Sequence, residues 1–154
     1  MRAYLVQHAE AKPKNVDPER GLTDDGECNA RAVAAHVGAL GLAAAEVWHS
    51  GKTRARQTAE ILAPAVGARG AVEERGALGP KDDVEPVAAD LNARDADVMI
   101  VGHLPFMARL AGLLLTGDPA RQVVAFRNAG VVCLERDGDA WAVAWVVTPE
   151  VARP

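Results

Sequence analysis

Short apolar runs alternate with longer segments of helical periodicity along most of the chain. A brief run of apolar residues that ends at polar residues is typical of a buried strand. We expect such strands at residues 4–6, 46–50 and 97–101. Apolar residues spaced three and four apart predict helices. We expect helices at residues 23–40, 53–66, 84–91 and 105–115, the last apolar nearly all round and hence buried.

The first helix has a clear start signal. Thr23 can cap free backbone N–H groups, and the acidic residues that follow favour the positive end of the helix dipole. Gly41 is expected to stop the helix. Its predicted apolar stripe consists of Ala32, Val33, His36, Val37 and Leu40.

The last third of the chain changes character. Residues 130–134 and 140–147 are rich in β-branched and aromatic residues, and Asp137-Gly138 between them indicates a hairpin. Strands alternating with helices favour a parallel sheet covered on both faces. We therefore expect one α/β domain over residues 1–154, with three layers, a mostly parallel sheet flanked by helices, and an antiparallel C-terminal edge hairpin.

Charge and composition argue against nucleic-acid-binding and membrane proteins. The chain of 154 residues carries a formal net charge of -4, so it lacks the broad basic surface of a nucleic-acid-binding protein. No stretch approaches the ~20 apolar residues that cross a bilayer, and the first apolar run is too short for a signal peptide. The two cysteines, Cys28 and Cys133, are expected to be buried free thiols. We expect a cytoplasmic protein with no membrane and no nucleic-acid partner.

Polar residues end three of the predicted strands: Gln7-His8, His49-Ser50 and Gly102-His103. In open α/β sheets, ligands bind beyond the carboxyl ends of the strands. Two histidines there, close to a helix start with Arg54 and Arg56, indicate an anion pocket. Each of these residues alone is more commonly structural, so the hypothesis rests on their occurring together. His49 is a candidate for supporting the pocket.

Four motifs carry a family resemblance. They are the strand end at His8, the helix start Arg20-Gly21-Leu22-Thr23-Asp24-Asp25-Gly26, the stretch Ser50-Gly51-Lys52-Thr53-Arg54-Ala55-Arg56-Gln57-Thr58-Ala59, and Val101-Gly102-His103-Leu104-Pro105. In order and spacing they resemble the motifs of the histidine phosphatase superfamily, with its phosphoglycerate mutase-like fold. Within it, they are most similar to those of the small SixA-type phosphohistidine phosphatases.

The resemblance implies a phosphatase that works through a phosphohistidine intermediate. It makes His8 the nucleophile, Arg54 the phosphate-binding arginine and His103 a second histidine that binds the phosphoryl group. Arg20 matches an additional arginine of the SixA-type members, and Gln7 and Ser50 would also bind substrate. No metal and no other cofactor is implied. His8 must attack as the neutral imidazole, and neighbouring cations would lower its pKa.

Three positions depart from the family pattern: Gln7 replaces an arginine, Ala9 a glycine and Gly51 a proline. Loss of one of two bidentate arginines could cost on the order of 3 kcal/mol of transition-state stabilisation, or about a hundredfold in rate. Gln7 can still donate hydrogen bonds, and Arg20 could supply part of the missing charge.

The general acid decides between substrates. Family members that cleave esters use a glutamate to protonate the leaving group, and Ala77 aligns with that position, with Glu73 and Glu74 nearby. A phosphohistidine substrate releases an imidazole, which needs less help from an acid. We therefore favour a phosphohistidine protein as substrate. The alternatives are a phosphomonoesterase for a small metabolite, with Glu73 or Glu74 as the acid, and a non-catalytic module that binds phosphate or a phosphoprotein.

Overall fold

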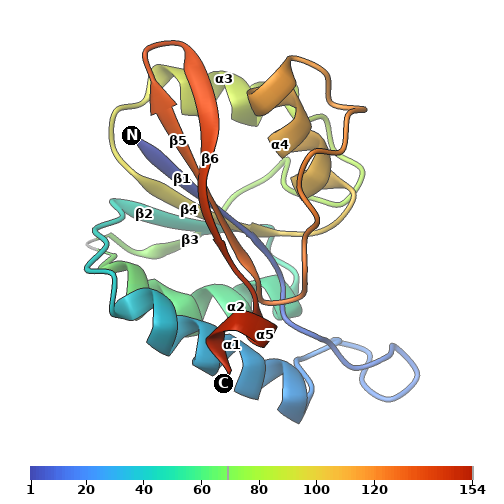
Figure 1. Cartoon of the computed structure of the whole chain (residues 1–154). Helices are drawn as coiled ribbons and strands as arrows, with labels where there is room; N and C mark the ends of the chain where they lie inside the picture. Colours follow the sequence, from blue (N-terminus) through green and yellow to red (C-terminus); the bar gives the residue numbers. More distant parts are fainter. Residues whose placement is uncertain (69, 154) are drawn as a thin grey trace.

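Six strands form one mixed sheet in the order β3-β2-β4-β1-β5-β6 (Figure 1). The first four are mutually parallel, and β5 and β6 run antiparallel at one edge. The computed structural model describes residues 1–68 and 70–153. The strands are β1 (Arg2–Gln7), β2 (Glu46–His49), β3 (Val72–Glu74), β4 (Val98–Gly102), β5 (Val131–Asp137) and β6 (Ala140–Val147).

Helices cover both faces of the sheet, which gives the expected three layers. In Figure 1, α3 and α4 lie above the sheet, and α1, α2 and α5 lie below it. The helices are α1 (Asp24–Gly38), α2 (Thr53–Leu62), the 3-10 helix η1 (Ala63–Val66), α3 (Glu85–Ala93), α4 (Phe106–Thr116) and α5 (Pro149–Ala152). The predicted fold class, including the C-terminal edge hairpin, is confirmed.

The central strands are apolar throughout because each face of the sheet has its own core. Leu5 of β1 and Ile100 of β4 belong to the core beneath α3 and α4. Their chain neighbours Val6 and Met99 belong to the core against α1 and α2. Alternation along a strand sends successive side chains to opposite faces, so strands covered on both sides read as unbroken apolar runs.

The start of α1 follows the predicted cap. The Thr23 hydroxyl accepts a hydrogen bond from the Gly26 N–H at 2.9 Å and donates one to a Glu10 carboxylate oxygen at 2.8 Å. Gly26 itself is dictated by packing, because a Cβ there would lie 2.2 Å from the Glu10 carbonyl oxygen. The helix start is thereby fixed against the segment that follows His8.

The apolar stripe expected on α1 is only partly right. The helix ends at Gly38, so Leu40 lies beyond it and is 49% exposed, and His36 is also exposed. Four positions of α1 are buried, namely Gly26, Ala30, Val33 and Val37. The predicted stripe shares Val33 and Val37 with the buried face of α1. It wrongly extends to His36 and Leu40 and misses the first half of the helix.

Other differences lie at element ends. The helix expected over residues 53–66 changes to the 3-10 helix η1 after Leu62, since Pro64 lacks the N–H that would continue the α-helix. Neither β3 nor α5 was predicted, because both are too short for a periodic signal.

One of the two cysteines differs from expectation. Cys133 is buried as expected, but Cys28 is exposed on α1, so that prediction was wrong. Within the described ranges, no helix has the length and apolarity needed to span a membrane.

Candidate active site

The carboxyl ends of β1, β4 and β2 lie side by side and bring the predicted polar residues together. β4 lies between β1 and β2, with Gln7 opposite Gly102 and His49 opposite Val101. The strands continue into His8, Ser50 and His103, and the His8 N–H donates to the Gly102 carbonyl at 2.9 Å. The ring centroids of His8 and His103 lie 5.1 Å apart with an interplanar angle of 55°. Imidazoles 95 positions apart in sequence are therefore neighbours.

The environment of His8 fits a nucleophile. Its Nδ1 lies 2.7 Å from the Ala9 carbonyl oxygen, which can only accept, so the proton belongs on Nδ1 and Nε2 keeps its lone pair. Burial lowers the pKa of His8, and the charges of Arg54 and Arg20 lower it further, against the opposing effect of the Ala9 hydrogen bond. The imidazole is therefore neutral at neutral pH.

His103 is 2% exposed and is held by Ser50, whose Oγ lies 2.5 Å from Nε2. Burial lowers the pKa of His103 to about 3, with further contributions from His8, Arg54, Lys52 and Arg20. This imidazole is also neutral at neutral pH. Its Nδ1 is buried and has no hydrogen-bond partner in the described part of the chain.

Arg54 lies in the first turn of α2 and supplies charge next to both imidazoles. Its Nε is buried and has no hydrogen-bond partner among residues 1–68 and 70–153. Burial and the nearby Arg20 lower the pKa of this guanidinium. A buried guanidinium N–H without an acceptor is costly unless an anion binds there. Arg54 is therefore suited to bind an oxyanion beside His8.

A folded-back loop places Arg20 near the same site. The Lys12 N–H donates to the Gly21 carbonyl at 2.9 Å, and Asp17 accepts the Gly21 N–H at 2.9 Å. Arg20 has a left-handed backbone with φ of 51°, and its Nε donates to the Lys12 carbonyl at 3.0 Å. The hydrogen bonds of Gly21 and of the Arg20 side chain thus stabilise this left-handed backbone. The charge of Arg20 lowers the pKa values of His8, His103 and Arg54.

Two residues that tie the site together were missed in the sequence. The buried Thr58 hydroxyl accepts the Ala9 N–H at 2.9 Å and donates to the Arg54 carbonyl at 2.7 Å. Asn128 Nδ2 donates to the His8 carbonyl at 2.8 Å. Thr58 belonged to a motif whose threonine had no assigned role. Asn128 lies 120 positions from His8, in a segment with no local signal, so only the fold could reveal it.

The three departures from the family pattern have different structural settings. Ala9 is fully buried in a small cluster with Leu22, Ala30 and Ala129, which leaves room for its methyl group. Gly51 has φ of 88°, which proline cannot adopt, so the turn before α2 differs from a proline-containing turn. Gln7 is half-buried at the end of β1, and its carbonyl accepts the Ala129 N–H at 3.0 Å.

The candidate acids Glu73 and Glu74 lie on β3, the neighbour of β2. Glu73 is 3.5 Å from Arg75 in an ion pair, and Glu74 packs against the Gly51 turn, where a Cβ on Gly51 would lie 2.3 Å from its Oε1. Arg54 and Arg20 lower the pKa of both His8 and His103, whereas the Glu74 carboxylate acts on His49, the neighbour of Ser50. Ala77, at the position expected for the acid, is exposed with φ of 61°.

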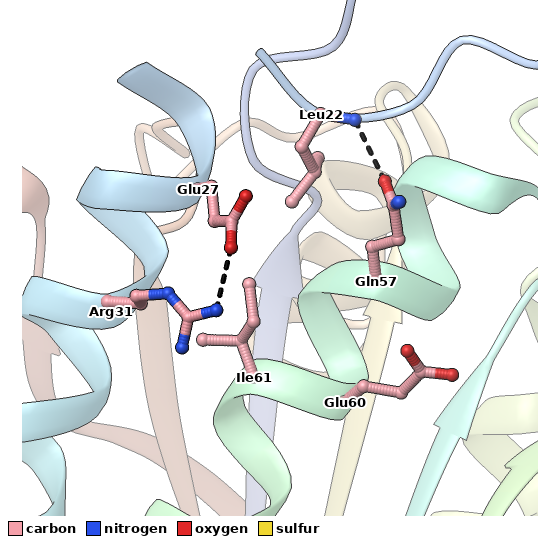
Figure 2. Close-up of a pocket in the computed structure, with 6 residues that line it drawn as sticks. All are labelled: Leu22, Glu27, Arg31, Gln57, Glu60 and Ile61. Carbon is pink, nitrogen blue, oxygen red and sulfur yellow. Dashed lines mark hydrogen bonds and ion pairs between the residues drawn. The ribbon is translucent and has the colours of Figure 1, made fainter. Parts of the chain in front are cut away.

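A separate cavity of about 210 Å³ lies between α1 and α2. Figure 2 shows its walls: Glu27 and Arg31 from α1, Gln57, Glu60 and Ile61 from α2, and Leu22 from the preceding loop. Gln57 Oε1 accepts the Leu22 N–H there at 2.8 Å, which fixes the loop to α2. None of the six predicted site residues lines this cavity. Among residues 1–68 and 70–153, no three His, Cys, Asp or Glu side chains group closely enough to hold a metal ion.

Known proteins resemble this chain in sequence. Residues 3–78 match the histidine phosphatase superfamily (branch 1). An uncharacterized protein of Picosynechococcus sp. is 32% identical over 142 residues, covering 87% of this chain and 84% of that protein.

Two solved structures extend the likeness to the whole fold. The protein histidine phosphatase SixA complexed with tungstate superposes with a TM-score of 0.84 at 24% identity, covering 97% of each chain. A phosphoserine phosphatase mutant of Entamoeba histolytica superposes with a TM-score of 0.72 at 13% identity, covering 97% of this chain and 98% of that one. The match to the family model, together with the likeness of the whole fold to SixA, shows that this chain belongs to the histidine phosphatase superfamily.

Proposed function

We propose that this protein is a phosphatase that transfers a phosphoryl group to His8 Nε2 and then to water, and that its substrate is phosphohistidine on a protein. The observation that carries the proposal is the state of His8. Its Nδ1 is committed to the Ala9 carbonyl, its pKa is lowered, and it lies beside His103 in a cationic pocket. Such an imidazole is neutral and has a lone pair available for attack.

In the first step, the lone pair of His8 Nε2 forms a bond to phosphorus, and the bond from phosphorus to the leaving group breaks. Phosphoryl transfer depends mostly on positioning and on neutralising the charge of the equatorial oxygens. Arg54 and Arg20 supply positive charge for those oxygens. Ser50 and His103 supply polar hydrogens without a net charge, since His103 is neutral.

In the second step, water attacks the phosphoryl group on His8. The bond from phosphorus to Nε2 breaks, inorganic phosphate leaves, and the water gives up a proton to the solvent or to phosphate. The Nδ1–H of His8 stays hydrogen-bonded to Ala9 throughout, so the imidazole returns to its original tautomer. Splitting the displacement in this way replaces one difficult step with two easier ones.

The preference for phosphohistidine rests on the leaving group. The charged side chains that act on His8, Arg54 and Arg20, are cationic, and Ala77 aligns with the position where family members that cleave esters carry the acid. An imidazole leaves more readily than an alkoxide and depends less on a strong acid. Proteins of this fold include both a protein histidine phosphatase and a phosphoserine phosphatase, so the fold alone leaves the substrate open.

The test compares two substrates with wild type and His8→Ala. We expect wild type to remove phosphate from a phosphohistidine-containing protein domain, with a phosphoryl group trapped on His8 by rapid quenching, and His8→Ala to do neither. Faster hydrolysis of a simple alkyl phosphate, lost in Glu73→Gln or Glu74→Gln, would instead establish a metabolite phosphatase. Phosphate binding without turnover or a trapped phosphoryl group would establish a binding module and refute the proposal.

A further inference from the structure

The edge strand β6 has the sequence of an interior strand. Its eight residues, Ala-Trp-Ala-Val-Ala-Trp-Val-Val, contain no charge, no proline and no glycine. A strand that borders solvent on one face usually alternates apolar and polar residues, whereas an unbroken apolar run is typical of a strand covered on all sides. β6 nevertheless lies at the end of the sheet, next to β5 alone (Figure 1).

The opposite edge of the same sheet shows the usual protection. β3 has three residues, and two of them are Glu73 and Glu74. Short length and charge are the common means by which proteins prevent an edge from pairing with another chain. β6 is neither short nor charged, and its one protective feature is a bulge at Ala144, with regular register over residues 140–143 and 145–147. The two edges of this sheet are therefore protected very differently.

The free side of β6 offers both backbone and apolar side chains. Within the described residues, its backbone groups hydrogen-bond only to β5. Val143 is 44% exposed and Val146 is 38% exposed, on the face that carries α3 and α4. Ala140, Ala142 and Ala144 are exposed as well. An added antiparallel strand would satisfy the free N–H and C=O groups and cover these side chains.

We propose that β6 pairs with β6 of a second copy of this chain, antiparallel about a twofold axis, so that two six-stranded sheets become continuous. A twofold interface uses the same surface on both partners, and an antiparallel edge is complementary to itself. The net charge of -4 makes two copies repel over most of their surfaces. An uncharged strand eight residues long is a place where they can approach.

The charges that flank β6 also suit this arrangement. Asp137 and Asp139 lie at the hairpin tip, before the strand. Beyond its other end lie Arg127 and Arg153, with Glu150 offsetting one of them. Antiparallel pairing places the acidic tip of one copy beside the more basic end of the other. A second copy is therefore a better match than a strand of arbitrary sequence.

The test measures mass in solution and uses a matched pair of variants. Pairing of two eight-residue strands gives a small interface, and small interfaces bind weakly. We therefore expect monomers and dimers in equilibrium at protein concentrations of roughly 10 to 500 µM. Val143→Lys places two lysines near each other across the twofold axis and should abolish the dimer. Val123→Lys, at a site 46% exposed in the loop before β5, should dimerise like wild type.

Sedimentation equilibrium gives the association constant, and circular dichroism verifies that each variant is folded. The weight-average mass of wild type should rise steadily across the range, from near the monomer mass toward twice that mass. Hydrogen exchange at β6 amides should slow with concentration in wild type and in Val123→Lys only. A wild type that stays monomeric throughout, or a Val143→Lys variant that dimerises as well as Val123→Lys, would overturn the proposal. Neither readout depends on phosphatase activity.

Discussion

Thr58 connects the nucleophile to the phosphate-binding helix, so its hydroxyl is the most informative single group to remove. In Thr58→Val the shape is kept and the hydrogen bonds to Ala9 and Arg54 are lost. The Arg54 carbonyl keeps its partner within α2, but the Ala9 N–H is left buried without an acceptor. An unsatisfied buried donor costs about 1–3 kcal/mol. We therefore expect the free energy of unfolding to fall by about 2 kcal/mol.

The same change should reach the chemistry, because the Ala9 peptide also holds His8 Nδ1. A displacement of the nucleophile by a fraction of an ångström to 1 Å reduces kcat/KM by roughly 10- to 100-fold. Urea denaturation and turnover of a phosphohistidine protein measure the two effects. Thr53→Val is the matched control, since the one hydrogen bond of the Thr53 hydroxyl among the described residues is an exposed contact of 3.4 Å to Glu19. If Thr58→Val matches that control in both assays, the hydroxyl does not position His8.

Three further changes test other parts of the account. Gln7→Arg restores the family's charge, and we expect kcat to rise by roughly tenfold; unchanged or lower kcat would mean that the present site already compensates. Gly51→Ala should lower the free energy of unfolding by about 1–2 kcal/mol in urea denaturation, and more than Gly138→Ala. Both glycines have positive φ, but only at Gly51 does a Cβ meet another side chain, that of Glu74. The pKa of His103 is about 3 in the folded state, against an ordinary value of 6.5. Between pH 6.5 and 3, His103 is therefore protonated in the unfolded state but neutral in the folded state. The free energy of unfolding should therefore fall as pH drops from 6.5 toward 3, by up to about 1.4 kcal/mol per pH unit from this group, and His103→Gln should have a shallower slope in urea titrations at pH 5 and 7.5.

Much of the fold follows from local sequence. The strand at residues 98–102 and the cap at Thr23 were recognisable because a buried strand and a helix start each leave a complete signal within a few residues. The same holds for the Gly138 turn between β5 and β6. These features are set by neighbours in the chain.

Features set by distant residues were out of reach. The exposure of Cys28 depends on which face of α1 meets the sheet, and β3 exists only as a partner for β2. Asn128 reaches His8 only because β5 pairs with β1. We expected His8, Arg54 and His103 to lie together from the polar strand ends and the family resemblance. The hydrogen bonds of Thr58 and Ser50 that hold Ala9, Arg54 and His103 could not be foreseen, because their partners are distant in sequence.

A crystal structure with tungstate tests the central claim most directly. We expect a single tetrahedral anion within hydrogen-bonding distance of His8 Nε2, the Arg54 guanidinium and the His103 imidazole, with His8 Nδ1 still donating to Ala9. Tungstate bound elsewhere on the molecule, or in contact with only one of these three side chains, would contradict the account.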